Sequence, residues 1–480
     1  MDVAVRRVFL VAVGLFLILI VNLTYLQVAA APSLEKKPQN RLAVAQELRV
    51  RRGRILAWDG SVIAGVRKHS GFYYRTYPSG NLASHVVGYS SAVYGRSGIE
   101  ESMNRVLSGR AAELGLRSWA DQLLGLPRRG ADVTLTLVPT VQREAQRQLA
   151  GKRGAIVVVN PTSGAVVASA SAPSFSAVSL EKDWRKLRTS RGAPLLDRAN
   201  QALYPPGSAF KVVTAASALD AGVVTPRTRF TDTGTYGVAG GSVVNYHRER
   251  FGQLDFTAAL THSVNTVFGR VGVELGREGL VEGMRAFGFW QRPPLELPAG
   301  QVATSGRYRA ATLVEPDGAM DELAVAWAAC GQEQVMTSPL QMALVAAAVA
   351  NDGRLMRPYL VERVTDFRGR VISQAEPRVW VEQALTPETA AALNRMMQQV
   401  VRAGTGTAAA LAGIPVAGKT GTAETGRSTN QAWFIAFAPA DAPRVAVAVT
   451  IEDTAATGGE VAAPLAAAVL RVALEQGRLP

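Results

Sequence analysis

The stretch YPPGSAFKVVTAA, residues 204–216, determines how the rest of this chain is interpreted. Two prolines and a glycine predict a turn, and a run without helix breakers begins at Ser208 and continues to Leu219. A helix that starts there places Lys211 on the same face as Ser208, within reach of its hydroxyl. A serine N-cap followed by a lysine is also a common pattern. The pair therefore indicates a nucleophile and its base only if the chain supplies further partners.

Composition limits the classes of protein to which the chain can belong. Its 480 residues are 48% hydrophobic, which allows a large core and more than one domain. The formal net charge is +14, but lysine and arginine form no blocks with interleaved aromatic residues, so no nucleic acid partner is expected. A basic balance suits an anionic membrane, an anionic wall polymer or a solvated surface equally well. Cys330 is the single cysteine, and no H-E-x-x-H or C-x-x-C spacing occurs, so we expect no disulfide, metal or cofactor.

The N-terminus predicts a membrane anchor. Arg6 and Arg7 precede an uncharged apolar stretch, Val8 to Val28, which spans about 31 Å as a helix. We interpret residues 8–28 as an uncleaved transmembrane helix, and the flanking arginines predict residues 1–7 in the cytoplasm and the remainder outside the cell membrane. The alternative is a signal peptide cleaved near Ala31. Either interpretation places the catalytic part in an extracellular or periplasmic position.

Residues 29–150 predict a small mixed α+β domain without obvious catalytic residues, which we call the pedestal domain. An Asp59-Gly60 turn between two short apolar runs is typical of a hairpin. An amphipathic helix is expected from Gly98, and Pro139 is placed to open another helix.

Residues 151–480 predict a larger domain that closes a sheet with strands from both of its ends. Residues 154–171 form two β-rich runs joined by an NPTSG turn. We expect the fold class α/β, of the α+β type, with helices packed on a sheet and a helical subdomain between the sheet's two halves. The further strands are predicted at Ile414–Ala423, Ala432–Ala438 and Val445–Ile451, and the main helices at Ala258–Leu275, Ser338–Ala350 and Pro387–Arg402.

Three short strings together fit serine acyl transfer: SAFK at 208–211, SVN at 263–265 and KTGT at 419–422. Lys211 can act as a base if burial and a neighbouring cation lower its pKa, and Lys419 is a candidate for that cation. Ser263, expected in a helical region, can relay a proton to a leaving amine. Asn265 can hold Lys211 or the substrate amide through its two-sided hydrogen bonding.

The KTGT string predicts a strand that binds an extended peptide. Its free edge can pair with the substrate backbone, and the hydroxyls of Thr420 and Thr422 can bind a carboxylate with help from Lys419. Gly421 leaves room for that approach. The backbone N–H groups of Ser208 and Thr422 can form an oxyanion hole.

These strings resemble the active-site signature of penicillin-recognising serine transpeptidases. The stretches RGRILAWDGSVIA, SGIEESMNRVLSG, LDRANQALYPPGSAFK and VAGKTGTAETGRSTNQAWFIAFAP resemble class B penicillin-binding proteins, in particular the short actinobacterial penicillin-binding protein A group. The resemblance implies a dimerisation-like pedestal and a serine β-lactamase-like domain, with an antiparallel five-stranded sheet flanked by helices and an all-α subdomain. It implies that Ser208 is the nucleophile and Lys211 the base. It implies that Ser263 and Asn265 form the second motif, and that the substrate strand consists of Lys419, Thr420, Gly421 and Thr422.

The resemblance also implies a function. It predicts a peptidoglycan D,D-transpeptidase that crosslinks stem peptides through a serine acyl-enzyme, releases the terminal D-alanine and serves cell division or elongation. The implied substrates are stem peptides and lipid-linked precursor strands, and β-lactams are the implied inhibitors. A separate membrane glycosyltransferase of the SEDS family is the implied partner.

Other interpretations use the same residues differently. Residues 413–420, GIPVAGKT, match the P-loop string, but two further glycines follow where a helix is required, which disfavours an ATPase. Gly404-Thr405-Gly406 is a dinucleotide-like fragment without a preceding strand, and we interpret it as a helix end. A β-lactam sensor or β-lactamase can use the same serine, and an inert scaffold of the divisome or elongasome is a third alternative.

Overall fold

The computed structural model describes residues 3–25, 48–111, 128–316, 318–424 and 429–480. Helix α1 (Val3–Thr24) includes an apolar segment, Val5–Thr24, that is long enough to cross a membrane, and none of it is buried against the protein. The helix begins before the predicted span of 8–28, contains Arg6 and Arg7 and ends at Thr24, and the bounds of the span in a membrane stay a prediction. Residues 26–28 lie outside the described residues.

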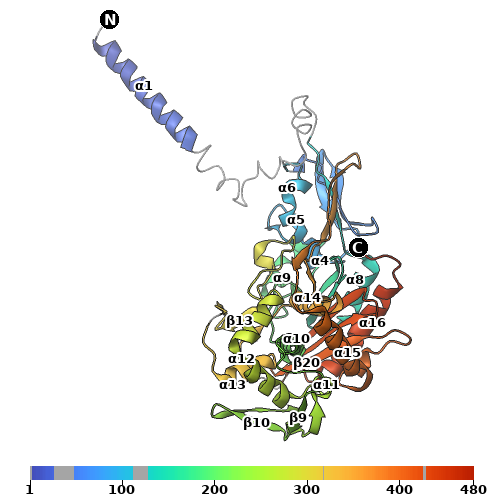
Figure 1. Ribbon diagram of the computed structural model, residues 1–480. Helices are drawn as coiled ribbons and strands as arrows, with labels where there is room; N and C mark the ends of the chain where they lie inside the picture. The colour runs from blue at the N-terminus through green and yellow to red at the C-terminus, as the bar shows by residue number, and fades with distance from the viewer. Residues whose placement is uncertain (1–2, 26–47, 112–127, 317, 425–428) are drawn as a thin grey trace.

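A six-stranded sheet forms the core of the pedestal (Figure 1). The predicted hairpin is confirmed, because β1 (Ile55–Leu56) and β2 (Val62–His69) pair across the Asp59-Gly60 turn. Two short helices, α5 (Gly98–Ser102) and α6 (Asn104–Leu107), replace the single helix expected from Gly98. In spatial order the strands are β18 (Val371–Gln374), β17 (Val361–Thr365), β6 (Asp132–Leu135), β1 (Ile55–Leu56), β2 (Val62–His69) and β3 (Phe72–Thr76).

Two segments do not lie where a division of the chain at residue 150 places them. Strands β17 and β18, from residues 361–374, complete the pedestal sheet. Helix α8 (Pro139–Gln148) packs on β8 (Val166–Ala172) and α16 (Ala463–Glu475) of the larger domain. We therefore propose that α8 belongs to the larger domain, which we call the catalytic domain, and that the β17–β18 hairpin belongs to the pedestal.

The catalytic domain contains the expected antiparallel five-stranded sheet. Helices α8 and α16 cover one face, and α14 (Pro339–Ala350) and α15 (Pro387–Ala403) pack on the other side. Strand β20 forms one edge of the sheet, as recognition of an extended peptide requires. The spatial order is β20 (Ala417–Glu424), β21 (Asn430–Ala438), β22 (Val445–Thr454), β7 (Gly154–Val159) and β8.

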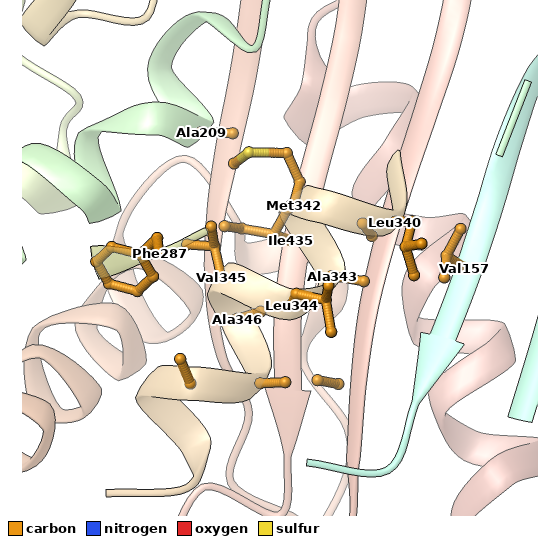
Figure 2. Close-up of a cluster of buried hydrophobic side chains, with 14 of the residues drawn as sticks. Val157, Ala209, Phe287, Leu340, Met342, Ala343, Leu344, Val345, Ala346 and Ile435 are labelled. Carbon is orange, nitrogen blue, oxygen red and sulfur yellow. The ribbon is translucent and has the colours of Figure 1, made fainter. Parts of the chain in front are cut away.

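Helix α14 is buried along its whole length between the sheet and the helical subdomain. Ser338 caps its N-terminus by accepting a hydrogen bond from the backbone N–H of Gln341, and Pro339 opens its first turn. Figure 2 shows Leu340 against Val157 of β7, and Met342 beside Ala209 of the predicted nucleophile turn. Because apolar side chains surround this helix, it packs tightly against the buried side of that turn.

The residues of the helical subdomain lie, along the chain, between β8 and β20. The helix predicted over Ala258–Leu275 is not continuous. It divides into α11 (Phe256–Thr261) and α12 (Asn265–Ala286), and residues 262–264 form the break. Helices α10 (Lys211–Asp220) and α13 (Glu322–Ala329) pack against α12. Small sheets that the sequence patterns do not predict lie at its margin: β9 (Arg229–Asp232) with β12 (Gly252–Asp255), β10 (Thr235–Val238) with β11 (Gly241–Val244), and β13 (Gly306–Arg309) with β14 (Thr312–Val314) and β15 (Val335–Met336). The remaining short elements are α4 (Ser84–Val87), β4 (Ser90–Ser91), β5 (Gly95–Arg96), α9 (Leu180–Thr189), β16 (Leu355–Met356) and β19 (Val379–Val381).

Candidate active site

Ser208 lies in η3 (Gly207–Phe210), a 3₁₀ turn that leads into α10. A helix was expected to begin at Ser208, but α10 begins one turn later, at Lys211. Gly207 has a φ of 52°, a backbone conformation that favours glycine. Ala209 and Phe210 are fully buried, whereas Ser208 keeps part of its surface accessible. The turn thus leaves the hydroxyl-bearing residue accessible.

The ammonium group of Lys211 is held by the second predicted string. Its Nζ donates to Asn265 Oδ1 at 2.6 Å, to the backbone oxygen of Ser263 at 2.7 Å and to Ser263 Oγ at 3.3 Å. The side chain is fully buried, and no carboxylate pairs with it in the part of the chain that the structure describes. Burial lowers the pKa of Lys211 to about 8. At pH 7 about a tenth of such amines are neutral and able to accept a proton.

Lys419 lies on β20 and also contacts the hydroxyl of Ser263. Its Nζ donates to Ser263 Oγ at 2.9 Å and to the backbone oxygen of Thr420 at 3.0 Å. Burial, followed by the positive charge of Lys211, holds the pKa of Lys419 well below its usual value. Ser263 Oγ accepts from both amines, so its own proton remains free to be donated. The sequence predicted that burial and Lys419 together lower the pKa of Lys211. Burial does so, but the charge effect runs the other way, since the charge of Lys211 lowers the pKa of Lys419.

Ser263 is placed by the break between two helices, not within one. It has a φ of 61°, in the left-handed region, so it leaves the helical path before α12 begins at Asn265. Asn265 Nδ2 donates to the backbone oxygen of Val244 at 2.9 Å, which orients its Oδ1 toward Lys211. An uncommon backbone conformation at this position is consistent with a functional site.

A supporting polar cluster around Asp232 was not found from the sequence. Asn245 Nδ2 and the hydroxyl of Thr266 both donate to the carboxylate of Asp232, Thr266 at 2.6 Å. The backbone N–H of Thr266 donates to Asn245 Oδ1 at 3.1 Å. These bonds hold the first turn of α12, and with it Asn265. No local sequence signal marks them, because the two side chains that donate to Asp232 come from residues 13 and 34 positions further along the chain.

The substrate strand lies directly against the nucleophile turn. A Cβ atom on Gly421 would lie 2.7 Å from the backbone oxygen of Pro206 and 2.9 Å from the backbone nitrogen of Ala209. A Cβ atom on Gly207 would lie 2.8 Å from the backbone oxygen of Thr422. The missing side chain of Gly421 therefore admits the nucleophile turn, and its expected role toward the substrate stays a prediction.

The two threonines of the strand are not equivalent. Thr420 is buried, and its Oγ1 lies 2.6 Å from the hydroxyl oxygen of Thr405. Thr422 is partly exposed, and its Oγ1 accepts from the backbone N–H of Gly458 at 3.2 Å. The sequence predicts a helix end at Gly404-Thr405-Gly406, and α15 does end at Ala403. The sequence does not predict the contact of Thr405 with Thr420 of β20.

A second group that the sequence did not predict holds the segment before Ser208. Trp433 Nε1 donates to the backbone oxygen of Pro205 at 2.9 Å. The hydroxyl of Tyr204 donates to Glu452 Oε1 at 2.6 Å. Arg198, with only 1% of its side chain exposed, donates to the same carboxylate. The turn is thereby attached to β21 and β22.

The site can perform serine acyl transfer. The turn that carries Ser208 packs on the edge strand β20, and the hydroxyl of Ser263 bridges the buried amines of Lys211, whose pKa is lowered, and Lys419. In the described part of the chain, no group of three or more His, Cys, Asp or Glu side chains is arranged to hold a metal ion.

Comparisons with known proteins agree with this geometry. Residues 154–471 match the family model of the penicillin-binding protein transpeptidase domain, and residues 52–133 match that of the penicillin-binding protein A dimerisation domain. The chain is 35% identical to peptidoglycan D,D-transpeptidase PbpA of Mycolicibacterium smegmatis, with 99% of this chain and 100% of the relative covered.

Solved structures give the same result. Penicillin-binding protein A from M. tuberculosis, as a ceftriaxone acyl-enzyme complex, has a TM-score of 0.81 at 33% identity, with 90% of this chain and 100% of that chain covered. The D,D-transpeptidase domain of a peptidoglycan glycosyltransferase from Eggerthella lenta has a TM-score of 0.79 at 40% identity, with 89% and 99% covered. The chain therefore belongs to the penicillin-binding protein transpeptidase family, and within it resembles penicillin-binding protein A.

Proposed function

We propose that this protein is a peptidoglycan D,D-transpeptidase that crosslinks stem peptides in cell wall synthesis and is acylated by β-lactams. The observation that carries the proposal is the hydroxyl of Ser263, which bridges the buried amines of Lys211 and Lys419. Lys211 follows Ser208 by one helical turn. This arrangement supplies a proton acceptor and a proton donor on the two sides of one reacting centre. The family membership and the D,D-transpeptidase names of the relatives support the same reaction.

The first half of the reaction forms the acyl-enzyme. Neutral Lys211 accepts the hydroxyl proton of Ser208 as its Oγ attacks the carbonyl between the two terminal D-alanines. The backbone N–H groups of Ser208 and Thr422 stabilise the resulting oxyanion. Ser263 donates its proton to the leaving D-alanine nitrogen and recovers one from a neighbouring ammonium group. The peptide C–N bond breaks, and D-alanine departs.

The second half joins two stems. An amine of a neighbouring stem peptide attacks the acyl-enzyme carbonyl, loses a proton to the site, and releases Ser208 with its hydroxyl restored. In this proposal the donor peptide pairs with the free edge of β20, and the strand segment from Lys419 to Thr422 binds its carboxylate. Attack by water in place of the amine makes the enzyme a carboxypeptidase.

The location follows from the N-terminal helix. We propose a single-pass anchor with its N-terminal end in the cytoplasm and the catalytic domain outside the membrane, because Arg6 and Arg7 lie at the N-terminal end of the apolar segment. A separate glycosyltransferase of the SEDS family is proposed as the partner that supplies glycan strands. We propose that α1 and the pedestal make this contact. A pull-down of the glycosyltransferase with the full-length protein, compared with a variant that lacks residues 48–111, tests the association.

The alternatives predict different fates for the acyl-enzyme. A β-lactamase must deliver water and release the acyl group rapidly, a sensor must acylate without joining peptides, and an inert scaffold must not react. No observation in the described residues favours any of them.

Two measurements test the proposal. Fluorescent penicillin should label the protein stably, and Ser208→Ala should abolish labelling. Ser217→Ala, on α10 but outside the site, should leave labelling intact. Purified protein supplied with glycan strands should yield crosslinked muropeptides by mass spectrometry. Trimmed but never joined products contradict transpeptidation, and rapid loss of the label indicates a β-lactamase.

A further inference from the structure

The turn Gly404-Thr405-Gly406 lies beside the substrate strand, although its position in the sequence gives it no obvious function. It follows the last residue of α15, Ala403, and precedes β20 by about ten residues. The backbone N–H of Thr405 donates to the backbone oxygen of Thr261 at 3.3 Å. Thr261 ends α11, two residues before Ser263. The turn therefore joins the segment that carries the second motif to the strand that carries the third.

Neighbouring glycines fix the backbone of Thr405. A Cβ atom on Gly404 would lie 2.4 Å from the backbone oxygen of Thr261, and a Cβ atom on Gly459 would lie 2.3 Å from the backbone oxygen of Thr405. Such distances leave no room for a side chain at either position. The glycines thus permit close contacts on both sides of Thr405, and those contacts determine where its side chain projects.

The hydroxyl of Thr405 is paired with that of Thr420. Their oxygens lie 2.6 Å apart, and Thr420 is only 6% exposed, whereas Thr405 is exposed. Each hydroxyl has one proton, so one donates to the other. If the buried Thr420 donates, the accessible Thr405 keeps a free proton for a ligand. Such a chain is polarised, because each hydrogen bond strengthens the next.

We propose that Thr405 is a substrate-binding residue whose hydroxyl donates to the carboxylate of the donor stem peptide, and that Thr420 positions it from below. This inference rests on the proposed function. In this arrangement Thr422 and Thr405 present the accessible hydroxyls to the carboxylate. Lys419 lies nearby, its Nζ on the backbone oxygen of Thr420. The ligand is defined by its chemistry as a C-terminal or β-lactam carboxylate.

The test compares two probes on the full-length protein: benzylpenicillin, which carries a carboxylate, and its methyl ester, which does not. Acylation rate constants are measured by intact mass spectrometry. Thr405→Val should lower the rate constant for benzylpenicillin about tenfold, the typical effect of one hydrogen bond to a charged group. The same variant should change the rate constant for the ester less than about twofold, because no carboxylate is present to lose the bond.

Matched variants separate binding from structure. Thr405→Ser retains the hydroxyl and should restore most of the benzylpenicillin rate. Thr407→Val, two residues further on and also exposed, should have no effect on either probe. Melting temperatures of all variants check the fold. If Thr405→Val does not fold, Thr405→Ala and Thr405→Ser provide the same comparison.

The outcomes are distinct. An equal fall with both probes, or no fall with benzylpenicillin, overturns the role of Thr405 while the proposed function stands. If the unaltered protein forms no adduct with either probe, the proposed function is wrong, and the inference about Thr405 is overturned with it.

Discussion

The catalytic domain and the pedestal each bury a cluster of charged side chains, and the two clusters are built in opposite ways. In the catalytic domain, Lys211 and Lys419 share the hydroxyl of Ser263, and no carboxylate in the described residues pairs with either lysine. In the pedestal, Glu100 is fully buried and meets two arginines. Both clusters are removed from water, but only the pedestal cluster contains a counter-charge, one carboxylate for two guanidinium groups, and we call it the compensated cluster.

The compensated cluster keeps its charges. Arg52 Nε donates to Glu100 Oε2 at 3.0 Å, and Arg75 Nε donates to Glu100 Oε1. Burial by itself would raise the pKa of Glu100, but the charges of Arg75 and Arg52 outweigh it and lower the pKa. Arg75 Nη1 also donates to the backbone oxygen of Gly53, which ties β1 and β3 to α5. This cluster fixes geometry.

The cluster of Lys211 and Lys419, which contains no counter-charge in the described residues, instead favours the neutral form of its amines. Burial of two amines without an anion lowers the pKa of both, which is the property that a base near neutral pH requires. The comparison shows that burial of charge supports structure when the partners are opposite and supports chemistry when they are alike. The following predictions test that distinction, from the largest expected effect to the smallest.

Replacing Lys211 separates chemistry from stability most sharply. Lys211→Met should lower the rate of acylation by penicillin about a thousandfold, because the general base is lost. The free energy of unfolding should fall by less than about 2 kcal/mol, since the lost hydrogen bonds are offset by removal of a desolvated charge. Stopped-flow acylation and denaturant unfolding measure the two quantities. Lys182→Met, on exposed α9, is the control, and a loss of stability as large as that of Glu100→Gln would contradict the distinction.

Neutralising the pedestal carboxylate should have the opposite profile. Glu100→Gln leaves two buried guanidinium groups without a counter-charge and should cost about 3–5 kcal/mol of unfolding free energy. The acylation rate of the folded fraction should stay within about twofold of the original, because the pedestal holds no member of the proposed site. Glu101→Gln, the exposed neighbour, is the matched control for denaturant unfolding.

The pH dependence of acylation should report Lys211. Its neutral fraction increases as pH rises through about 8, so the acylation rate should rise about tenfold per unit from pH 6 to 7 and level off above pH 8. A flat profile between pH 6 and 9 would contradict the assignment of Lys211 as base.

The same pKa has a consequence for stability with a defined sign. The folded value of about 8 lies below the ordinary value of 10.5, so between these pH values the unfolded chain binds more protons. The contribution of Lys211 to the free energy of unfolding should therefore rise from pH 8 to 10.5. The difference between the unaltered protein and Lys211→Met, measured by denaturant unfolding, isolates this contribution.

The smallest effect is expected where opposite charges support the nucleophile turn. Tyr204→Phe removes one hydrogen bond to Glu452, which keeps its contacts with Arg198 and Arg153. Acylation should fall about threefold and stability by about 1 kcal/mol. Tyr246→Phe, at an exposed position, is the control. A loss of acylation comparable with that of Lys211→Met would place Tyr204 in the chemistry itself.

Much of the fold could be predicted because its signals are local. The turn of the β7–β8 hairpin is marked by NPTSG, and α14 and α15 begin at Ser-Pro and Thr-Pro caps that accept the expected backbone hydrogen bonds. The five-stranded sheet follows from apolar runs of strand length.

The break at Ser263 could not be predicted in the same way. The sequence LTHSVNTVF contains no glycine or proline, so local propensity continues the helix through it. Contacts from distant segments decide otherwise: both lysine amines bond to Ser263, and Asn265 bonds to the strand before Asn245. Tertiary contacts override weak local preference here.

The sequence by itself determined the three strings, their order and most of the elements that carry them, because the strings occur together in one chain, although each has other uses when it stands alone. Only the tertiary structure decided the protonation of Lys211, the contact of Thr405 with Thr420, and the place of β17 and β18 in the pedestal. The physical reason is common to all three. Burial, hydrogen bonding and strand pairing between residues far apart in the chain depend on which surfaces meet, and local sequence does not encode that.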